Sequence, residues 1–125
     1  MNLDKVISGF FIILALTLNF GFFYGDPTDI AQHNRFELFA AILINLIATI
    51  YKLGDKTHLG AVMLATSLVA DIQLIAAASV WALGAYVTEM DAETVTVIIS
   101  LSGGALMANI VSVILFTGDV LKSKR

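Results

Sequence analysis

The chain has 125 residues, of which 58% are hydrophobic and only 14% are charged. A water-soluble domain carries about 25% charged residues, so this chain lacks the polar surface that a soluble fold needs. It has no cysteine, which excludes disulfides and thiolate metal sites. The net charge of −3 is small, and we expect no nucleic-acid partner. The composition predicts an integral membrane protein of a single domain, residues 1–125, with the lipid bilayer as its first partner.

Four uncharged or nearly uncharged stretches are each expected to form a membrane-crossing helix, for which about 20 residues are needed. The first lacks a small-residue cleavage site, so we expect a retained span rather than a signal peptide. The second has only 14 uncharged residues, Leu38 to Tyr51. The capping-box-like Asn34-x-x-Glu37 and the stop residue Gly54 extend it to spanning length. The expected helices are residues 5–25, 35–53, 58–88 and 92–121.

The basic residues indicate the orientation of these helices, because Lys and Arg resist translocation. With four spans, every basic residue except Arg35 falls on the same side of the membrane. The expected fold is therefore an all-α membrane protein of two helical hairpins with both termini in the cytoplasm. We expect it in a bacterial inner (plasma) membrane. The basic residues that agree are Lys5, Lys52, Lys56, Lys122, Lys124 and Arg125.

The opposite face is acidic. Its carboxylates either concentrate cations at the mouth of a pathway or simply fill a face from which lysines are excluded, and both readings are equally open. The stretch from Leu59 to Thr88 is about 45 Å long as a helix, so we expect the last hairpin to project outward; strong tilt is the alternative. The expected acidic mouth is Glu37, Glu89, Asp91 and Glu93.

A carboxylic acid interrupts the third apolar stretch near its middle. A carboxylate at the bilayer centre costs about 2.5–3.5 kcal/mol on insertion scales, and intramembrane acids by default mark ion or proton pathways. Amides are expected close to the level of Asp71 in the second and fourth helices, and somewhat further out in the first. The candidate pathway is Asp71, Asn45, Thr49, Asn109, Asn19 and Gln73.

The third helix is polar on two faces, because Gln73 lies about 200° around it from Asp71. Neither face should meet lipid. We therefore expect a symmetric homo-oligomer, in which one face turns to the core of the protomer and the other to a neighbouring copy or a shared axis.

Two functions fit these features. The first is a cation-conducting membrane protein, either a channel or a carrier, with Asp71 as the ion or proton site. Asp71 would then be a metal ligand if the ion is Ca²⁺, Na⁺ or K⁺, since hard cations prefer oxygen donors, or it would titrate in an alternating-access proton carrier. One feature argues against this function, because lysines at the cytoplasmic side would repel a cation that leaves the pathway there. The alternative is an accessory or scaffold subunit of a larger membrane complex, with Asp71 as hydrogen-bonding glue between helices.

Enzyme activity has no support in the sequence. No serine is expected beside a histidine at membrane depth, and there is no glycine-rich loop of the kind that binds phosphate. We expect no cofactor beyond a bound cation.

Overall fold

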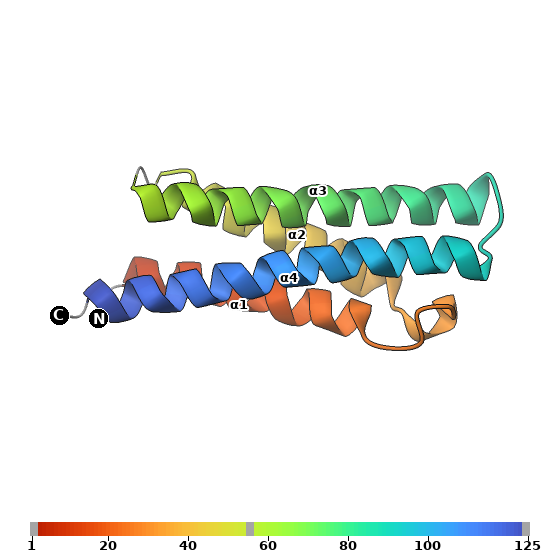
Figure 1. Cartoon of the computed structure of the whole chain (residues 1–125), viewed down its shortest axis with the longest axis horizontal. Coiled ribbons are helices and arrows are strands. Elements are labelled where there is room, and N and C mark those ends of the chain that lie inside the picture. Colours follow the sequence, from red (N-terminus) through yellow and green to blue (C-terminus); the bar gives the residue numbers. More distant parts are fainter. Residues whose placement is uncertain (1–2, 55–56, 124–125) are drawn as a thin grey trace.

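The computed structural model describes residues 3–54 and 57–123, and within these ranges every regular element is helical. The elements are α1 (Leu3–Phe23), a short 3₁₀ turn η1 (Ile30–Gln32), α2 (Arg35–Lys52), α3 (His58–Tyr86) and α4 (Ala92–Ser123) (Figure 1). Each α-helix begins and ends within two residues of the range expected from the sequence. The apolar runs and their flanking turn residues were therefore sufficient to predict the helices.

Short polar side chains begin the last three α-helices, because the first turn of a helix leaves backbone N–H groups without partners. The Asn34 side chain accepts from the Phe36 N–H at 2.8 Å, and Thr57 accepts from the Gly60 N–H at 3.0 Å. Asp91 accepts from the Thr94 N–H at 2.8 Å. These caps fix where α2, α3 and α4 start, and with them the register of the side chains that face inward.

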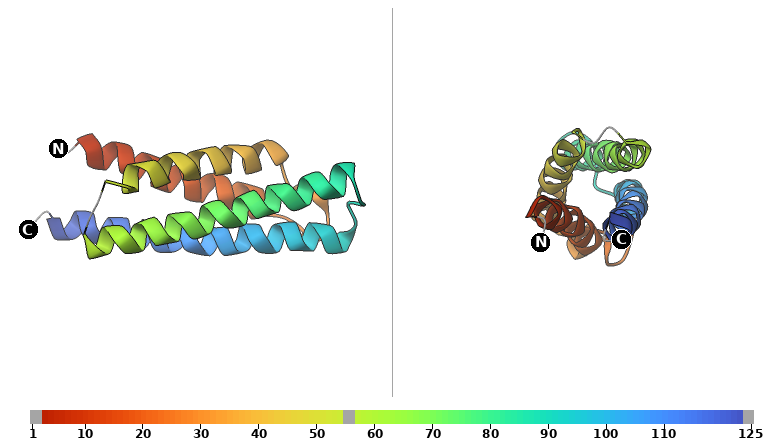
Figure 2. Two further views of the ribbon diagram at one scale, coloured as in Figure 1. Left: turned by 90° about the horizontal axis from the view of Figure 1, so that it is seen from above. Right: turned by 90° about the vertical axis from the view of Figure 1, so that its left-hand side faces the viewer.

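The four α-helices pack in chain order around a closed bundle. The neighbours in contact are α1 and α2, α2 and α3, α3 and α4, and α4 and α1, of which α3 and α4 have the largest contact. Viewed along the bundle, the helices surround a common centre, and the two ends of the chain lie at the same end of the molecule (Figure 2). We call this the terminal end. The α3–α4 connection extends further along the long axis than the α1–α2 connection (Figure 1).

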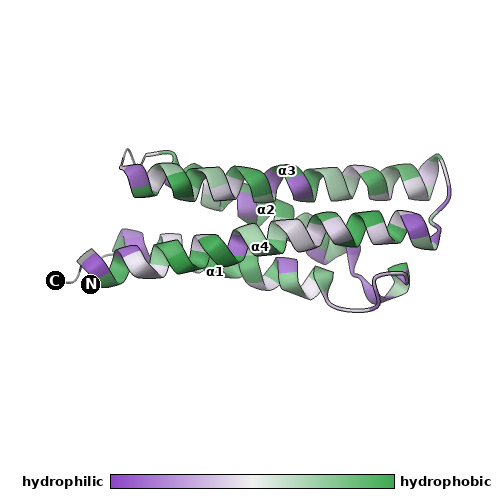
Figure 3. Cartoon of the chain, viewed as in Figure 1, coloured by the Kyte–Doolittle hydropathy of each residue, from purple (hydrophilic) through white to green (hydrophobic). Residues whose placement is uncertain are grey.

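Three described helices could cross a membrane by their length and composition: α1, α3 and residues Ala92–Lys122 of α4. Large apolar side chains, among them Phe10, Phe39 and Ile72, are exposed on the outside of the bundle. Asparagine, serine and aspartate are buried inside it. Hydrophilic bands lie between long hydrophobic stretches of the helices (Figure 3). This distribution suits lipid rather than water, and the chain is a multi-pass integral membrane protein.

The apolar core divides into two clusters. The larger includes Phe22 of α1, Leu38 of α2, Leu74 of α3 and Ile98 of α4, each at most 1% exposed. These residues lie toward the end of the bundle that holds the connections α1–α2 and α3–α4. The smaller cluster, built on Ile12, Ala48 and Met63, lies toward the terminal end. The buried polar groups described below occur between and beside these clusters.

Candidate functional site

Asp71 lies near the middle of α3 and is only 5% exposed. The Thr49 hydroxyl of α2 lies 2.6 Å from Asp71 Oδ2 and 2.8 Å from the backbone carbonyl of Asn45. A hydroxyl has one proton to donate but can also accept. It can donate to an ionised Asp71, or accept from a protonated Asp71 while it donates to Asn45. The contact therefore accommodates both protonation states of the carboxyl.

Lys52, the last residue of α2, is buried beside this carboxyl and is 6% exposed. Its ammonium donates to the Ser67 hydroxyl of α3 and, at 3.2 Å, to the Ser112 hydroxyl of α4. The charges of Lys52 and Asp71 act on each other, yet no nitrogen–oxygen distance between them falls within 4.0 Å. Ser112 also lies 2.6 Å from the Thr66 hydroxyl. We call the set the core polar cluster: Thr49, Lys52, Thr66, Ser67, Asp71 and Ser112.

The burial of Lys52 differs from the sequence analysis, which placed this residue with the basic residues at the cytoplasmic surface. The reason is helical geometry. Lys52 follows Asn45 and Thr49 at i+7 and i+3, so all three share the face of α2 that points inward. A step of three residues from Thr49, which the sequence analysis placed in the candidate pathway, reaches Lys52 on the same face and would have found it.

A second polar group joins α1 to α4. With the Asn19 amide oriented so that its nitrogen faces Ser102 Oγ and its oxygen faces Asn109 Nδ2, both at 3.1 Å, all three side chains have partners. Asn19, Ser102 and Asn109 are at most 3% exposed. The Asn45 amide donates to the Ala41 carbonyl of its own helix at 2.7 Å. Five of the six predicted pathway residues therefore form two separate groups, and Gln73 belongs to neither. No hydrogen bond of the described residues links Asn19 or Asn109 to Asp71.

Gln73 occupies the second polar face of α3. Its side chain lies against Gly104 of α4, where a Cβ atom would collide with the amide. The Oε1 atom of Gln73 is buried without a hydrogen-bond partner, as is Oδ1 of Asp71. Because α2 covers the Asp71 face and α4 covers much of the Gln73 face, one protomer shields most of both. The homo-oligomer stays a prediction, and the two polar faces alone no longer require it.

The predicted acidic mouth is divided between two places. Glu89, Asp91 and Glu93 are exposed around the α3–α4 connection, whereas Glu37 lies in the first turn of α2 against Gly21 of α1. Hydrogen bonds from Thr94, first from its backbone N–H and then from its side chain, hold the pKa of Asp91 below its ordinary value of 3.8. Asp91 thus also has a local structural role as the cap of α4.

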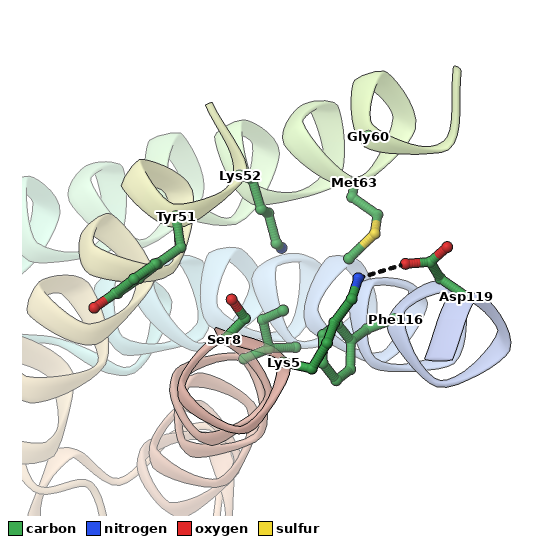
Figure 4. Close-up of a pocket in the computed structure, with 9 residues that line it drawn as sticks. Lys5, Ser8, Tyr51, Lys52, Gly60, Met63, Phe116 and Asp119 are labelled. Carbon is green, nitrogen blue, oxygen red and sulfur yellow. Dashed lines mark hydrogen bonds and ion pairs between the residues drawn. The ribbon is translucent and has the colours of Figure 1, made fainter. Parts of the chain in front are cut away.

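A pocket of about 130 Å³ opens at the terminal end. Residues from all four α-helices line it (Figure 4). Lys5 of α1 and Asp119 of α4 form an ion pair of 2.9 Å there, and Lys5 Nζ lies 5.9 Å from the centre of the Phe116 ring. Lys52 lines this pocket and also belongs to the core polar cluster. Lys52 thus connects the two, as does Met63, which lines the pocket and whose carbonyl accepts from the Thr66 hydroxyl of the cluster at 2.8 Å.

The described residues contain no group of three His, Cys, Asp or Glu side chains placed to hold a metal ion. Both ring nitrogens of the buried His33 already have hydrogen-bond partners. Nδ1 contacts the Phe22 carbonyl at 2.7 Å, and Nε2 contacts the Asp26 carbonyl at 2.8 Å. Asp71 has only the Thr49 hydroxyl as an oxygen neighbour in hydrogen-bond contact, and an ammonium nearby. This donor set is poor for Ca²⁺, which takes 6–8 oxygen ligands.

Residues 32–120 match the model of a family of unknown function, DUF6394. The chain belongs to this family. The part that matches DUF6394 spans α2, α3 and most of α4, and it contains the whole core polar cluster. Lys5 and Asn19 lie outside it. No curated protein and no solved structure matches the chain.

Proposed function

We propose that this protein moves a cation across the membrane, that the cation is a proton, and that Asp71 binds and releases it. The observation that supports this most directly is a buried carboxyl and a buried ammonium, Asp71 and Lys52, that influence each other without forming a direct ion pair. Purely structural buried pairs gain most of their stability from direct contact with good geometry. Here hydroxyl groups hold each charge separately, and one oxygen of the carboxyl has no partner.

A proton suits this site better than Ca²⁺, Na⁺ or K⁺. The positive charge of the Lys52 ammonium would repel a metal cation at Asp71. A metal ion also needs several oxygen ligands in place of its water. A proton needs only one acceptor, and the unpartnered Oδ1 of Asp71 supplies it.

The expected mechanism couples the charge of Asp71 to the packing of three helices. While Asp71 is ionised, it compensates the buried charge of Lys52. When Asp71 takes up a proton, Lys52 loses that compensation, and its hydrogen bonds to Ser67 on α3 and Ser112 on α4 must hold the ammonium alone. Protonation therefore changes the relative stability of arrangements of α2, α3 and α4, as alternating access requires.

The membrane placement is part of the same proposal: four crossings as two hairpins, both termini in the cytoplasm of a bacterial inner membrane, and a symmetric homo-oligomer. The common terminal end of the bundle supports an even number of crossings. Lys5 and Lys122 lie in the end turns of α1 and α4 at that end, whereas Arg35 lies at the opposite end. Lys56, Lys124 and Arg125 lie outside the described residues.

The test is ion flux into liposomes that contain the purified protein, measured for protons, Na⁺, K⁺ and Ca²⁺. We expect proton flux in the wild type, its loss in Asp71→Asn, and no change in Asp29→Asn, the same substitution at an exposed position outside the predicted acidic mouth. If another cation crosses the membrane and its flux is lost in Asp71→Asn, that ion and not the proton is the one transported. Absence of any flux would contradict transport.

The accessory or scaffold role is the second candidate, and the interhelical contacts favour it. The Thr49–Asp71 hydrogen bond joins α2 to α3, and the Asn19–Ser102 contact joins α1 to α4. Such contacts within membranes contribute about 0.6–2 kcal/mol each. If they are the whole role of Asp71, Asp71→Asn will weaken the fold or the capture of a membrane-protein partner while the wild type shows no flux.

A further inference from the structure

We infer that the pocket at the terminal end is the aqueous access route to the core polar cluster, and that the cluster is closed to the opposite end in this conformation. This deepens the proposed function, because it names the side from which Asp71 exchanges protons. The geometry and the test below do not depend on transport.

The pocket leads to the cluster through Lys52. The ammonium of Lys52 points into the space between α1 and α3, on the same side as Ser8 and Met63 (Figure 4). The same nitrogen donates to Ser67 and Ser112 in the core. A water molecule takes about 30 Å³ of liquid volume and needs two to four polar partners. The pocket, of about 130 Å³, has room for several waters.

Polar groups along the pocket supply those partners at successive depths. The Lys5–Asp119 ion pair lies at the rim, with side chains 39% and 28% exposed, so the rim is wet. Ser8 lies one turn further along α1 than Lys5, and Lys52 lies deeper. The ion pair joins α1 to α4 across the mouth, and we infer that it restricts access while it is closed.

A pocket of about 330 Å³ also opens at the other end of the bundle, between α2 and α3, but its lining contains no residue of the core polar cluster. The larger apolar cluster fills the bundle on that side of Asp71 with side chains of all four α-helices, and Phe22, Leu74 and Ile98 are completely buried. A close-packed apolar interior stays dry, and the unpartnered Gln73 Oε1 is enclosed against Gly104 of α4. The buried polar side chains of α1 and α4 at that level, Asn19 and Ser102, bond to each other. Of these two end pockets, only the one at the terminal end is lined by a residue of the core polar cluster, so we expect water to reach the cluster from that end.

The test uses the absence of native cysteine, so that each variant carries a single thiol. Ser8→Cys, Ser67→Cys and Ser102→Cys are reacted in lipid nanodiscs with a small anionic methanethiosulfonate that does not cross lipid. Ser67 and Ser102 form a matched pair, because both are buried serines on spanning helices, at 3% and 0% exposure. We expect Ser8→Cys to react fastest and Ser67→Cys next, with Ser102→Cys at least about tenfold slower than Ser67→Cys.

The rim is tested by adding Asp119→Asn to Ser67→Cys. Breaking a partly exposed ion pair should speed the reaction by up to about fivefold, and an unchanged rate would remove the ion pair as a gate. If Ser102→Cys reacts as fast as Ser67→Cys, or if neither Ser8→Cys nor Ser67→Cys reacts, the access route is wrong. If Ser67→Cys fails to fold, the reaction rate of Ser112→Cys measures access to the same place, because both serines bond to Lys52.

The outcomes separate this inference from the proposed function. The expected labelling pattern without proton flux would keep the access route and overturn transport. Proton flux with preferential labelling at Ser102→Cys would keep transport and reverse the side of access.

Discussion

The interaction of Lys52 with Asp71 can be measured as a coupling free energy. Lys52→Met removes the ammonium but keeps most of the apolar stem. It also removes two hydrogen bonds from a charged donor, each worth about 1.5–3 kcal/mol, and leaves Asp71 without a counter-charge. We expect this substitution to lower the free energy of unfolding by about 3–5 kcal/mol. Asp71→Asn keeps the contact with Thr49 but leaves the ammonium uncompensated.

The double variant, with Lys52→Met and Asp71→Asn together, should be more stable than the sum of the two single losses predicts. The two charged groups are more than 4.0 Å apart, so at an effective dielectric constant of about 20 their attraction is at most about 4 kcal/mol. We expect a coupling free energy of about 1–4 kcal/mol.

The assay is denaturant unfolding in detergent micelles, followed by the fluorescence of Trp81. This is the only tryptophan, and its ring lies 5.9 Å from that of Phe22 in the larger apolar cluster. If the loss of stability in the double variant equals the sum of the two single losses to within about 0.5 kcal/mol, the two charges do not interact. That result would refute the coupled site on which the proposed mechanism depends.

Two further predictions concern single positions. Gly104→Ala should lower the free energy of unfolding by about 1–3 kcal/mol, because the added methyl group displaces Gln73; Gly54→Ala, where a Cβ meets nothing within 4 Å, is the matched control, and equal losses would contradict the close contact. The ionised Asp91 carboxylate accepts hydrogen bonds from Thr94 and so stabilises the first turn of α4. This stabilisation is fully present above pH 3.8, the ordinary pKa, and is lost as the pH falls through the lower folded-state pKa. The Thr94 amide resonance should accordingly titrate below pH 3.8 and stop titrating in Asp91→Asn; a midpoint at or above that value would contradict the cap.

The helices could be predicted from the sequence because their signals are local. Apolar runs of spanning length, and capping residues such as Asn34 and Asp91, act through neighbours a few residues away. The burial of Asp71 could also be predicted, since a carboxyl in the middle of an apolar helix must turn away from lipid. Its pairing with Thr49 could be predicted only in part, because the polar pattern placed Thr49 in the candidate pathway but did not show that Thr49 contacts α3.

The environment of Lys52 could not be derived from charge alone. A lysine at the end of a span usually extends to the interface, and only the packing of α3 and α4 around α2 places its ammonium between Ser67 and Ser112. The separation of Asn109 from Asp71 could not be predicted either. Two side chains at a similar depth in the membrane can face different neighbouring helices. Both results depend on the rotation of each helix within the bundle.

The proposed transport depends on the titratable carboxyl of Asp71 carrying the proton. The most direct measurement is voltage-driven proton uptake by liposomes that contain the wild type, Asp71→Asn or Asp71→Glu. Asparagine has nearly the shape of aspartate but does not titrate, whereas glutamate titrates but is longer. We expect uptake to fall at least about tenfold in Asp71→Asn, since intramembrane proton relays depend on titratable side chains, and to persist in part in Asp71→Glu. Equal uptake by folded Asp71→Asn and the wild type would contradict the account.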